Sequence, residues 1–92
     1  MPFMMNRSNI EALVYENIAD VFMMTPEEVR VNPETRFRED LAAVSLQYFP
    51  LISNLEEELD IALDFKEFQI AAPTFTKAVD FVWKTYEKQM IQ

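Results

Sequence analysis

Residues 45–60 read SLQYFPLISNLEEELD, and this stretch decides the fold class. Leu51, Ile52, Leu55 and Leu59 recur at intervals of three and four residues, which places their side chains on one face of an α-helix. The polar and acidic residues between them fall on the other faces. The segment therefore predicts an amphipathic helix with one buried side.

Pro50 stands inside this pattern. If the helix begins at Ser45, Pro50 lies beyond the first turn, where its missing N–H and its ring would cost about 3 kcal/mol in a regular helix. The helix could kink between Leu46 and Pro50, or it could begin near Phe49 with Ser45 on a looser turn. We expect a distorted first turn near Pro50.

Two further long helices flank this segment. Ser8-Asn9-Ile10-Glu11 is typical of a capping box, and an apolar stripe follows it to about Met23. Pro73-Thr74-Phe75 opens the last helix, with Thr74 as the expected cap. Its predicted buried side consists of Phe75, Ala78, Val79, Val82 and Tyr86.

The segments between the long helices are shorter and less regular. Thr25-Pro26-Glu27-Glu28-Val29 has the hydroxyl cap, proline and acids of a helix start, and Asn32-Pro33 ends it soon afterwards. A long irregular connection to Ala43 should follow, anchored in the core by Phe37 and Leu41.

A short helix or turn is expected between Leu63 and Ile70. No segment alternates convincingly with period two, and the chain has no glycine for a tight hairpin. The predicted fold is an all-α bundle of three main helices plus one short helix. We expect one domain over residues 1–92, with a flexible N-terminus at residues 1–7.

Composition excludes several classes of function. The chain has no His and no Cys, which removes imidazole bases, thiol chemistry and the common zinc sites, so no metal site is expected. A net charge of −8 argues against nucleic acid. The first residues lack the pattern of a secretory signal, and no apolar run approaches the ~20 residues that span a bilayer. A cytoplasmic monomer is the expectation.

The negative charge is unevenly distributed. No basic residue occurs between Glu39 and Phe65, whereas seven acids do. Such a run is most often a solvated helix face. It could also dock basic partners, and the two interpretations are compatible.

The order of several short motifs resembles the acyl carrier protein family from about Ile10 to Val82. The matching pieces are Pro26-Glu27-Glu28-Val29, Phe37-Arg38-Glu39-Asp40-Leu41, Ser45-Leu46, Leu55-Glu56-Glu57-Glu58-Leu59-Asp60 and Ala78-Val79-Asp80-Phe81-Val82. The resemblance implies a four-helix bundle in which Ser45 carries 4′-phosphopantetheine. The thiol of that arm would hold an acyl or aminoacyl group as a thioester.

The resemblance also implies partners and site residues. The partners would be a phosphopantetheinyl transferase and acyl-transfer or synthase enzymes with basic docking surfaces. Leu59 and Leu63 would lie near the apolar cleft for the acyl chain. The predicted docking residues are Leu46, Tyr48, Glu56, Glu57 and Asp60.

The chain departs from the family around Ser45. Val44 replaces the usual Asp, which caps the helix and helps the transferase to recognise the site, so Ser45 is expected to cap the helix itself. Gln47 and Pro50 stand where relatives often carry acids. Ala42 replaces a Gly, which predicts a loop with no left-handed residue at that point.

These changes favour a specialised carrier for a dedicated biosynthetic pathway, of the fatty acid or polyketide kind. The alternative is an unmodified carrier-like protein that acts as a binding or scaffold subunit. A plain helical interaction domain with an accidental resemblance is a third interpretation. An enzyme is the weakest one, because no His can activate Ser45 as a nucleophile.

Overall fold

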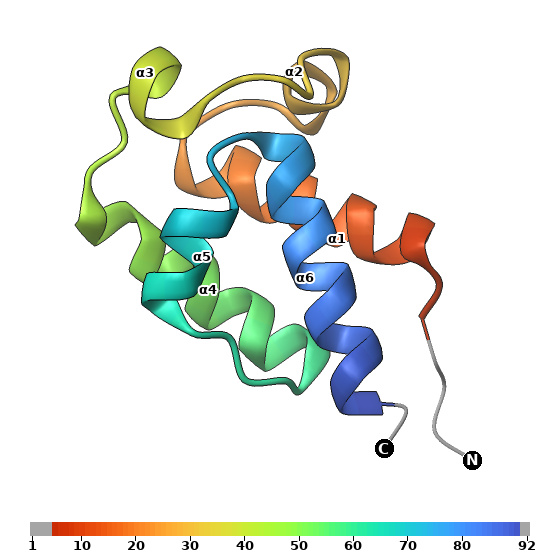
Figure 1. Cartoon of the computed structure of the whole chain (residues 1–92). Helices are drawn as coiled ribbons and strands as arrows, with labels where there is room; N and C mark the ends of the chain where they lie inside the picture. Colours follow the sequence, from red (N-terminus) through yellow and green to blue (C-terminus); the bar gives the residue numbers. More distant parts are fainter. Residues whose placement is uncertain (1–4, 91–92) are drawn as a thin grey trace.

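The computed structural model describes residues 5–90, and within them the chain forms six helices and no strand (Figure 1). The predicted all-α bundle is confirmed. None of the helices in this range has the length and apolar character needed to cross a bilayer. The helices are α1 (Arg7–Val21), α2 (Pro26–Val31), α3 (Phe37–Leu41), α4 (Ser45–Leu59), α5 (Phe65–Ala71) and α6 (Phe75–Met90).

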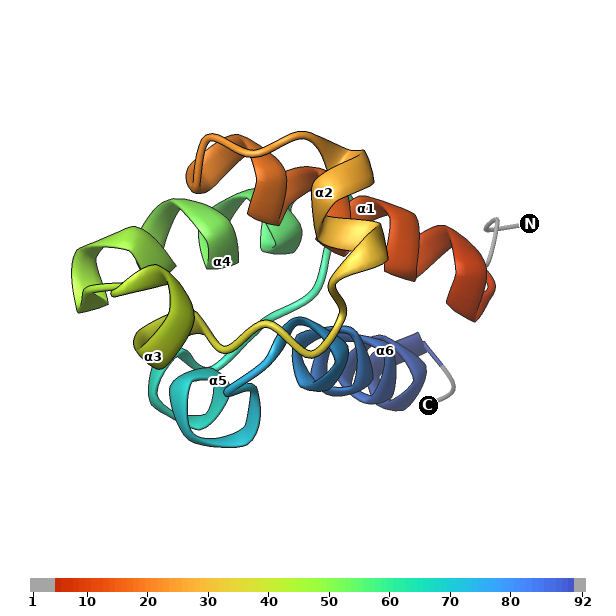
Figure 2. The same cartoon turned by 90° about the horizontal axis from the view of Figure 1, so that it is seen from above.

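The three long helices form the body of the bundle (Figures 1 and 2). Helix α1 packs against α2, α4 and α6, and α5 packs against both α4 and α6. Each long helix contributes one apolar stripe to a common core, which is the arrangement that amphipathic helices require. The fully buried aliphatic residues of this core include Ile10, Val14, Ile18, Leu51, Leu55, Val79 and Val82.

Aromatic side chains join the short helices to the long ones. The ring of Phe37 on α3 lies 5.7 Å from that of Tyr48 and 5.2 Å from that of Phe75. The ring of Tyr48 in turn lies 6.0 Å from that of Phe68 on α5. All four side chains are buried. The prediction that Phe37 anchors its connection in the core is confirmed.

The predicted start of the first helix is wrong by two residues. Asn6, not Ser8, caps α1, because its Oδ1 accepts the Asn9 amide at 2.9 Å. Arg7 belongs to the helix and pairs with Asp80 of α6. The flexible N-terminus predicted for residues 1–7 thus overlaps the cap and the first residue of α1, and residues 1–4 lie outside the described range.

The other two predicted caps are confirmed. Thr25 and Glu28 form a reciprocal capping box at the start of α2, with bonds of 3.1 and 2.9 Å. The Thr74 hydroxyl accepts the Lys77 amide at 3.2 Å in the first turn of α6. In both cases the cap residue and its partner are three positions apart, so local sequence suffices to identify them.

The connection before α4 is more regular than the sequence predicts. Residues 37–41 form helix α3, and the chain before it is tied to the start of α6. The amide of Phe37 bonds to the carbonyl of Pro73 at 3.0 Å, and the amide of Phe75 to that of Thr35 at 3.1 Å. These partners are some forty positions apart in the sequence, so no local pattern could reveal them.

Ala42 adopts the left-handed conformation, with φ 52° and ψ 39°. The prediction that this loop needs no left-handed residue is therefore wrong. The amide of Ala43 bonds back to the carbonyl of Phe37 at 2.9 Å, and this closure of α3 forces the turn. Because Ala has a Cβ, the conformation carries a cost of about 1–2 kcal/mol that Gly would avoid.

Helix α4 runs from Ser45 through Pro50 to Leu59 as one helix. The suggestion that the helix begins only near Phe49 is wrong. The first turn is tight, since the Gln47 amide bonds to the Val44 carbonyl at 3.0 Å. Because proline has no N–H, the Leu46 carbonyl lacks the hydrogen bond that residue 50 would normally donate to it. Both residues are exposed, so water can bond to this carbonyl instead.

Candidate functional site

Ser45 is the first residue of α4, and its side chain is exposed. Val44 precedes it as the N-cap in an extended conformation, with no oxygen to offer the first amides. Gln47 supplies half of a capping box, because its Oε1 accepts the Val44 amide at 2.8 Å. Within residues 5–90 the Ser45 hydroxyl makes no hydrogen bond, so the prediction that Ser45 caps the helix is wrong.

The surroundings of Ser45 on α4 are apolar and exposed. Val44 is 57% exposed and Leu46 is 74% exposed, which fits the predicted contact of Leu46 with a partner. Phe49, one turn further on, is half exposed and stacks on Phe65 of α5 at 4.3 Å between ring centroids. Exposed apolar residues gathered in this way are typical of interaction surfaces.

Tyr48 does not belong to this surface. Only 1% of it is exposed, and its ring packs between those of Phe37 and Phe68. The prediction of Tyr48 as a docking residue is wrong, because position 48 lies on the same helix face as Leu51 and Leu55. Burial raises the pKa of the Tyr48 hydroxyl, and the neighbouring Arg38 opposes that rise.

The other predicted docking residues lie at the far end of α4. Leu46 and Glu57 are eleven positions apart, which corresponds to about 16 Å along a helix. Glu57 and Asp60 are exposed, whereas Glu56 is partly buried and its Oε2 accepts the Leu63 amide at 2.8 Å. The predicted set therefore forms no single patch with Ser45.

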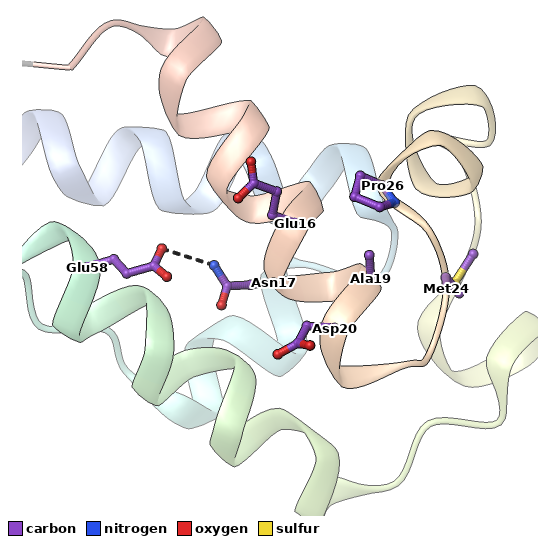
Figure 3. A pocket seen from close by; sticks show the side chains of 7 residues that line it. All are labelled: Glu16, Asn17, Ala19, Asp20, Met24, Pro26 and Glu58. Atoms are coloured by element: carbon purple, nitrogen blue, oxygen red, sulfur yellow. Dashed lines mark hydrogen bonds between the residues drawn. The ribbon is translucent and has the colours of Figure 1, made fainter.

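An acidic cleft of about 450 Å³ lies between α1 and α4 (Figure 3). Glu16 and Asp20 of α1 face it together with Glu58, whose Oε2 accepts a bond of 3.2 Å from the buried Asn17. Sequence reasoning missed Glu16 and Asp20, although their spacing of four residues places them on one helix face. Within residues 5–90, no group of three or more acids is arranged to hold a metal ion.

Leu59 and Leu63, the residues predicted near an acyl cleft, are both buried in the core. The loop between them is held by Gln89, whose side chain donates to the Ala62 carbonyl at 2.8 Å and accepts its amide at 3.0 Å. This clamp fixes the loop against α6. The structure places both leucines in the common core, and their role towards an acyl chain stays a prediction.

Known proteins align with nearly the whole chain, although no family model matches it. An acyl carrier protein of Rubrobacter xylanophilus is 37% identical over 78 residues, which cover 85% of this chain and 93% of that protein. One from Thermosynechococcus vestitus has the same values. One from Chlorobium phaeobacteroides is 30% identical over 76 residues, covering 80% and 96%. These identities extend over most of the chain and nearly the whole of each relative, and the chain belongs to the acyl carrier protein family.

Proposed function

We propose that this protein carries an acyl or aminoacyl group on 4′-phosphopantetheine attached to Ser45, for a dedicated biosynthetic pathway. The exposed Ser45 hydroxyl, free of internal hydrogen bonds among the described residues, carries the proposal. A modifying enzyme can reach it without breaking any bond of the fold. Because Ser45 is the first residue of the long helix α4, the helix fixes the position of the hydroxyl relative to a docked partner.

The attachment transfers the phosphopantetheine group from coenzyme A to Ser45. Ser45 Oγ forms a bond to the phosphorus of coenzyme A that bears the pantetheine, the pyrophosphate link breaks, and adenosine 3′,5′-bisphosphate leaves. The proton of the hydroxyl passes to a base of the transferase, because this chain has no His to accept it. The free amides at the start of α4 favour the phosphate once it is attached. When attached, the group supplies a terminal thiol that holds the cargo as a thioester.

The surface supports two kinds of partner contact. Leu46 and the apolar residues beside Ser45 suit the enzyme that acts at the site. Glu57 and Asp60, with the acidic cleft of Glu16, Asp20 and Glu58, suit basic side chains further away, which would speed association. We further propose that the protein is not itself an enzyme, and that it works as a cytoplasmic monomer.

The experiment is a direct test of attachment. The purified protein is incubated with coenzyme A, Mg²⁺ and a broad-specificity phosphopantetheinyl transferase, and its intact mass is measured. We expect a gain of one phosphopantetheine, which Ser45→Ala abolishes. Ser53→Ala is the matched control, since Ser53 is an exposed serine of the same helix, and it should be modified normally.

The alternative is an unmodified scaffold, and Val44 in the position of the usual Asp is the observation that favours it. Failure of modification with several transferases, including any encoded nearby, would support that alternative and refute the carrier. Modification of Ser45→Ala would show that another residue is the attachment point.

A further inference from the structure

A second cleft opens between α3 and α5. Its volume is about 410 Å³, and Arg38, Lys66, Gln69 and Ile70 line it. Two of these four residues are cations, in a chain with eight basic and sixteen acidic residues. Ile70 is 82% exposed and provides an apolar wall. The cleft therefore combines positive charge with apolar surface, in contrast to the acidic cleft of Figure 3.

The two cations of this cleft are not neutralised by ion pairs. Neither Arg38 nor Lys66 has a carboxylate within 4 Å in the described part of the chain. The neighbouring acids of α3 are engaged elsewhere, since Asp40 and Glu39 both pair with Arg36. Arg36 holds the pKa of Asp40 below its usual value.

The guanidinium of Arg38 is also oriented by the fold. Its Nη2 donates to the Gln69 Oε1 at 2.8 Å, which ties α3 to α5 across the cleft. The Gln69 amide keeps its own N–H donors for a ligand. A fixed guanidinium with a nearby amide and ammonium is a set of donors suited to a carboxylate, which Arg can bind through two parallel bonds.

The cleft lies at the Ser45 end of the molecule. Phe37, which precedes Arg38, contacts the ring of Tyr48, and Phe68, which precedes Gln69, contacts the same ring. Phe65, which precedes Lys66, stacks on Phe49. Because Tyr48 and Phe49 follow Ser45 by three and four positions, these ring contacts place α3 and α5, which carry the lining residues, beside the first turns of α4 (Figure 2).

We propose that this α3–α5 cleft binds a carboxylate at the free end of the group tethered to Ser45. The inference rests on the proposed carrier function and narrows the cargo to acyl groups that keep a second carboxylate, such as the half-thioester of a dicarboxylic acid. Arg38 and Lys66 bind the carboxylate, and Ile70 and the Lys66 stem pack against the methylene groups.

The first experiment uses the unmodified protein, so it does not depend on Ser45. Succinyl-N-acetylcysteamine and butyryl-N-acetylcysteamine, which differ in the terminal carboxylate, are titrated while the amide NMR signals are followed. We expect saturable shifts at Arg38, Lys66 and Gln69 with the succinyl probe, and shifts at least about fivefold smaller with the butyryl probe. Equal responses to the two probes would overturn the proposal.

Two charge variants distinguish binding at a local site from attraction by the overall charge of the protein. Lys66→Met should weaken succinyl binding about fivefold. Lys84→Met removes one exposed cation from α6 and should leave binding unchanged. Equal weakening by the two variants would show that only net charge matters, and it would refute the site.

The second experiment tests the source of the carboxylate. Ser45 is loaded with succinyl-phosphopantetheine or butyryl-phosphopantetheine, and the cleft signals are compared. Shifts confined to the succinyl form support the proposal. If the free probe binds but the tethered group leaves the cleft unchanged, the carboxylate belongs to a partner and the proposal is wrong. If Ser45 cannot be loaded although the free probe binds, the carrier function fails while the carboxylate site stands.

Discussion

The two ends of helix α4 are built in opposite ways. At the Ser45 end the cap residue has no polar side chain, a proline interrupts the hydrogen bonds, and apolar side chains face solvent. At the Leu59 end, the carboxylates of Glu56 and Glu58 accept hydrogen bonds from Leu63 and Asn17, so two of the charged residues are held by the fold. The proposed attachment point therefore lies at the end of α4 with fewer stabilising side-chain bonds, in keeping with the lower stability of binding regions generally.

Residues only two positions apart at the Ser45 end differ greatly in exposure. Leu46 projects into solvent while Tyr48 is enclosed by aromatic rings. The helical repeat of 3.6 residues separates them onto different faces. The proposed interaction surface and the core are thus two positions apart on one helix.

The largest expected change in stability comes from removing the buried aromatic ring at the Ser45 end of α4. Tyr48→Ala should lower the free energy of unfolding by about 3–5 kcal/mol, because it empties a space among the aromatic rings. Leu46→Ala should change it by less than about 0.5 kcal/mol, since the side chain is exposed. Urea denaturation measures both. Similar losses from the two variants would contradict the division between surface and core.

The second effect concerns the interrupted helix. Pro50→Ala restores a donor for the Leu46 carbonyl, worth about 3 kcal/mol, partly offset by a freer unfolded chain. We expect a net gain of about 2 kcal/mol in the free energy of unfolding by urea denaturation. Ser53→Ala, at an exposed site of the same helix, should gain no more than about 0.5 kcal/mol. A loss of stability in Pro50→Ala would show that the local backbone requires proline.

The third prediction concerns the missing side-chain cap at the start of α4. Val44→Asp supplies a carboxylate for the first amides of α4 and completes the half-box made by Gln47, so stability should rise by about 1 kcal/mol. The cap depresses the pKa of the new carboxyl, so this gain should vanish as pH falls below about 4.

The same variant tests recognition of the site. If loss of the usual Asp weakens recognition, Val44→Asp should also be modified faster by a phosphopantetheinyl transferase, as followed by intact mass over time. Val44→Ala is the control and should show neither gain. An unchanged rate in Val44→Asp would count against a recognition defect.

The smallest effect compares the left-handed residues at either side of α4. Ala42→Gly should stabilise the protein by about 0.5–1 kcal/mol, because Gly has no Cβ to strain at φ 52°. Asp60→Gly should change stability by less than about 0.5 kcal/mol, since Asp tolerates this conformation better. Thermal unfolding gives both values.

A helical position provides the control for these glycine variants. Ala12→Gly, at an exposed site within α1, should lose about 1 kcal/mol. If Ala42→Gly lost as much stability as Ala12→Gly, relief of the backbone strain at position 42 would not outweigh the added freedom of the unfolded chain.

Much of the fold was predictable because its signals are local. The caps Thr25 and Thr74 each have their partner three residues away, and the apolar stripe of residues 51–59 has a helical period. Helix α3 was not predicted, since it forms beside a connection held by bonds to Pro73 and Phe75. Proline at position 50 suggested a distorted first turn or a later start for α4, but the helix runs from Ser45 through Pro50, and exposure of that turn to water makes the missing bond tolerable.

The candidate site shows the same division. Ser45 could be proposed as the attachment point from its neighbours in the sequence, and the structure leaves this residue exposed. The docking prediction for Tyr48 was wrong because the local sequence does not distinguish a buried aromatic residue near Ser45 from an exposed one. Its burial depends on Phe37 and Phe68, eleven and twenty residues away.

The sequence by itself determined the helical class, the acidic character and the position of Ser45, because periodicity, charge and short motifs act over a few residues. The tertiary structure decided which acids are held by the fold, which aromatic residues are enclosed, and that Arg38 and Lys66 meet across one cleft. Those properties depend on the packing of segments distant in the chain, where burial and charge pairing are set by neighbours that the local sequence does not contain.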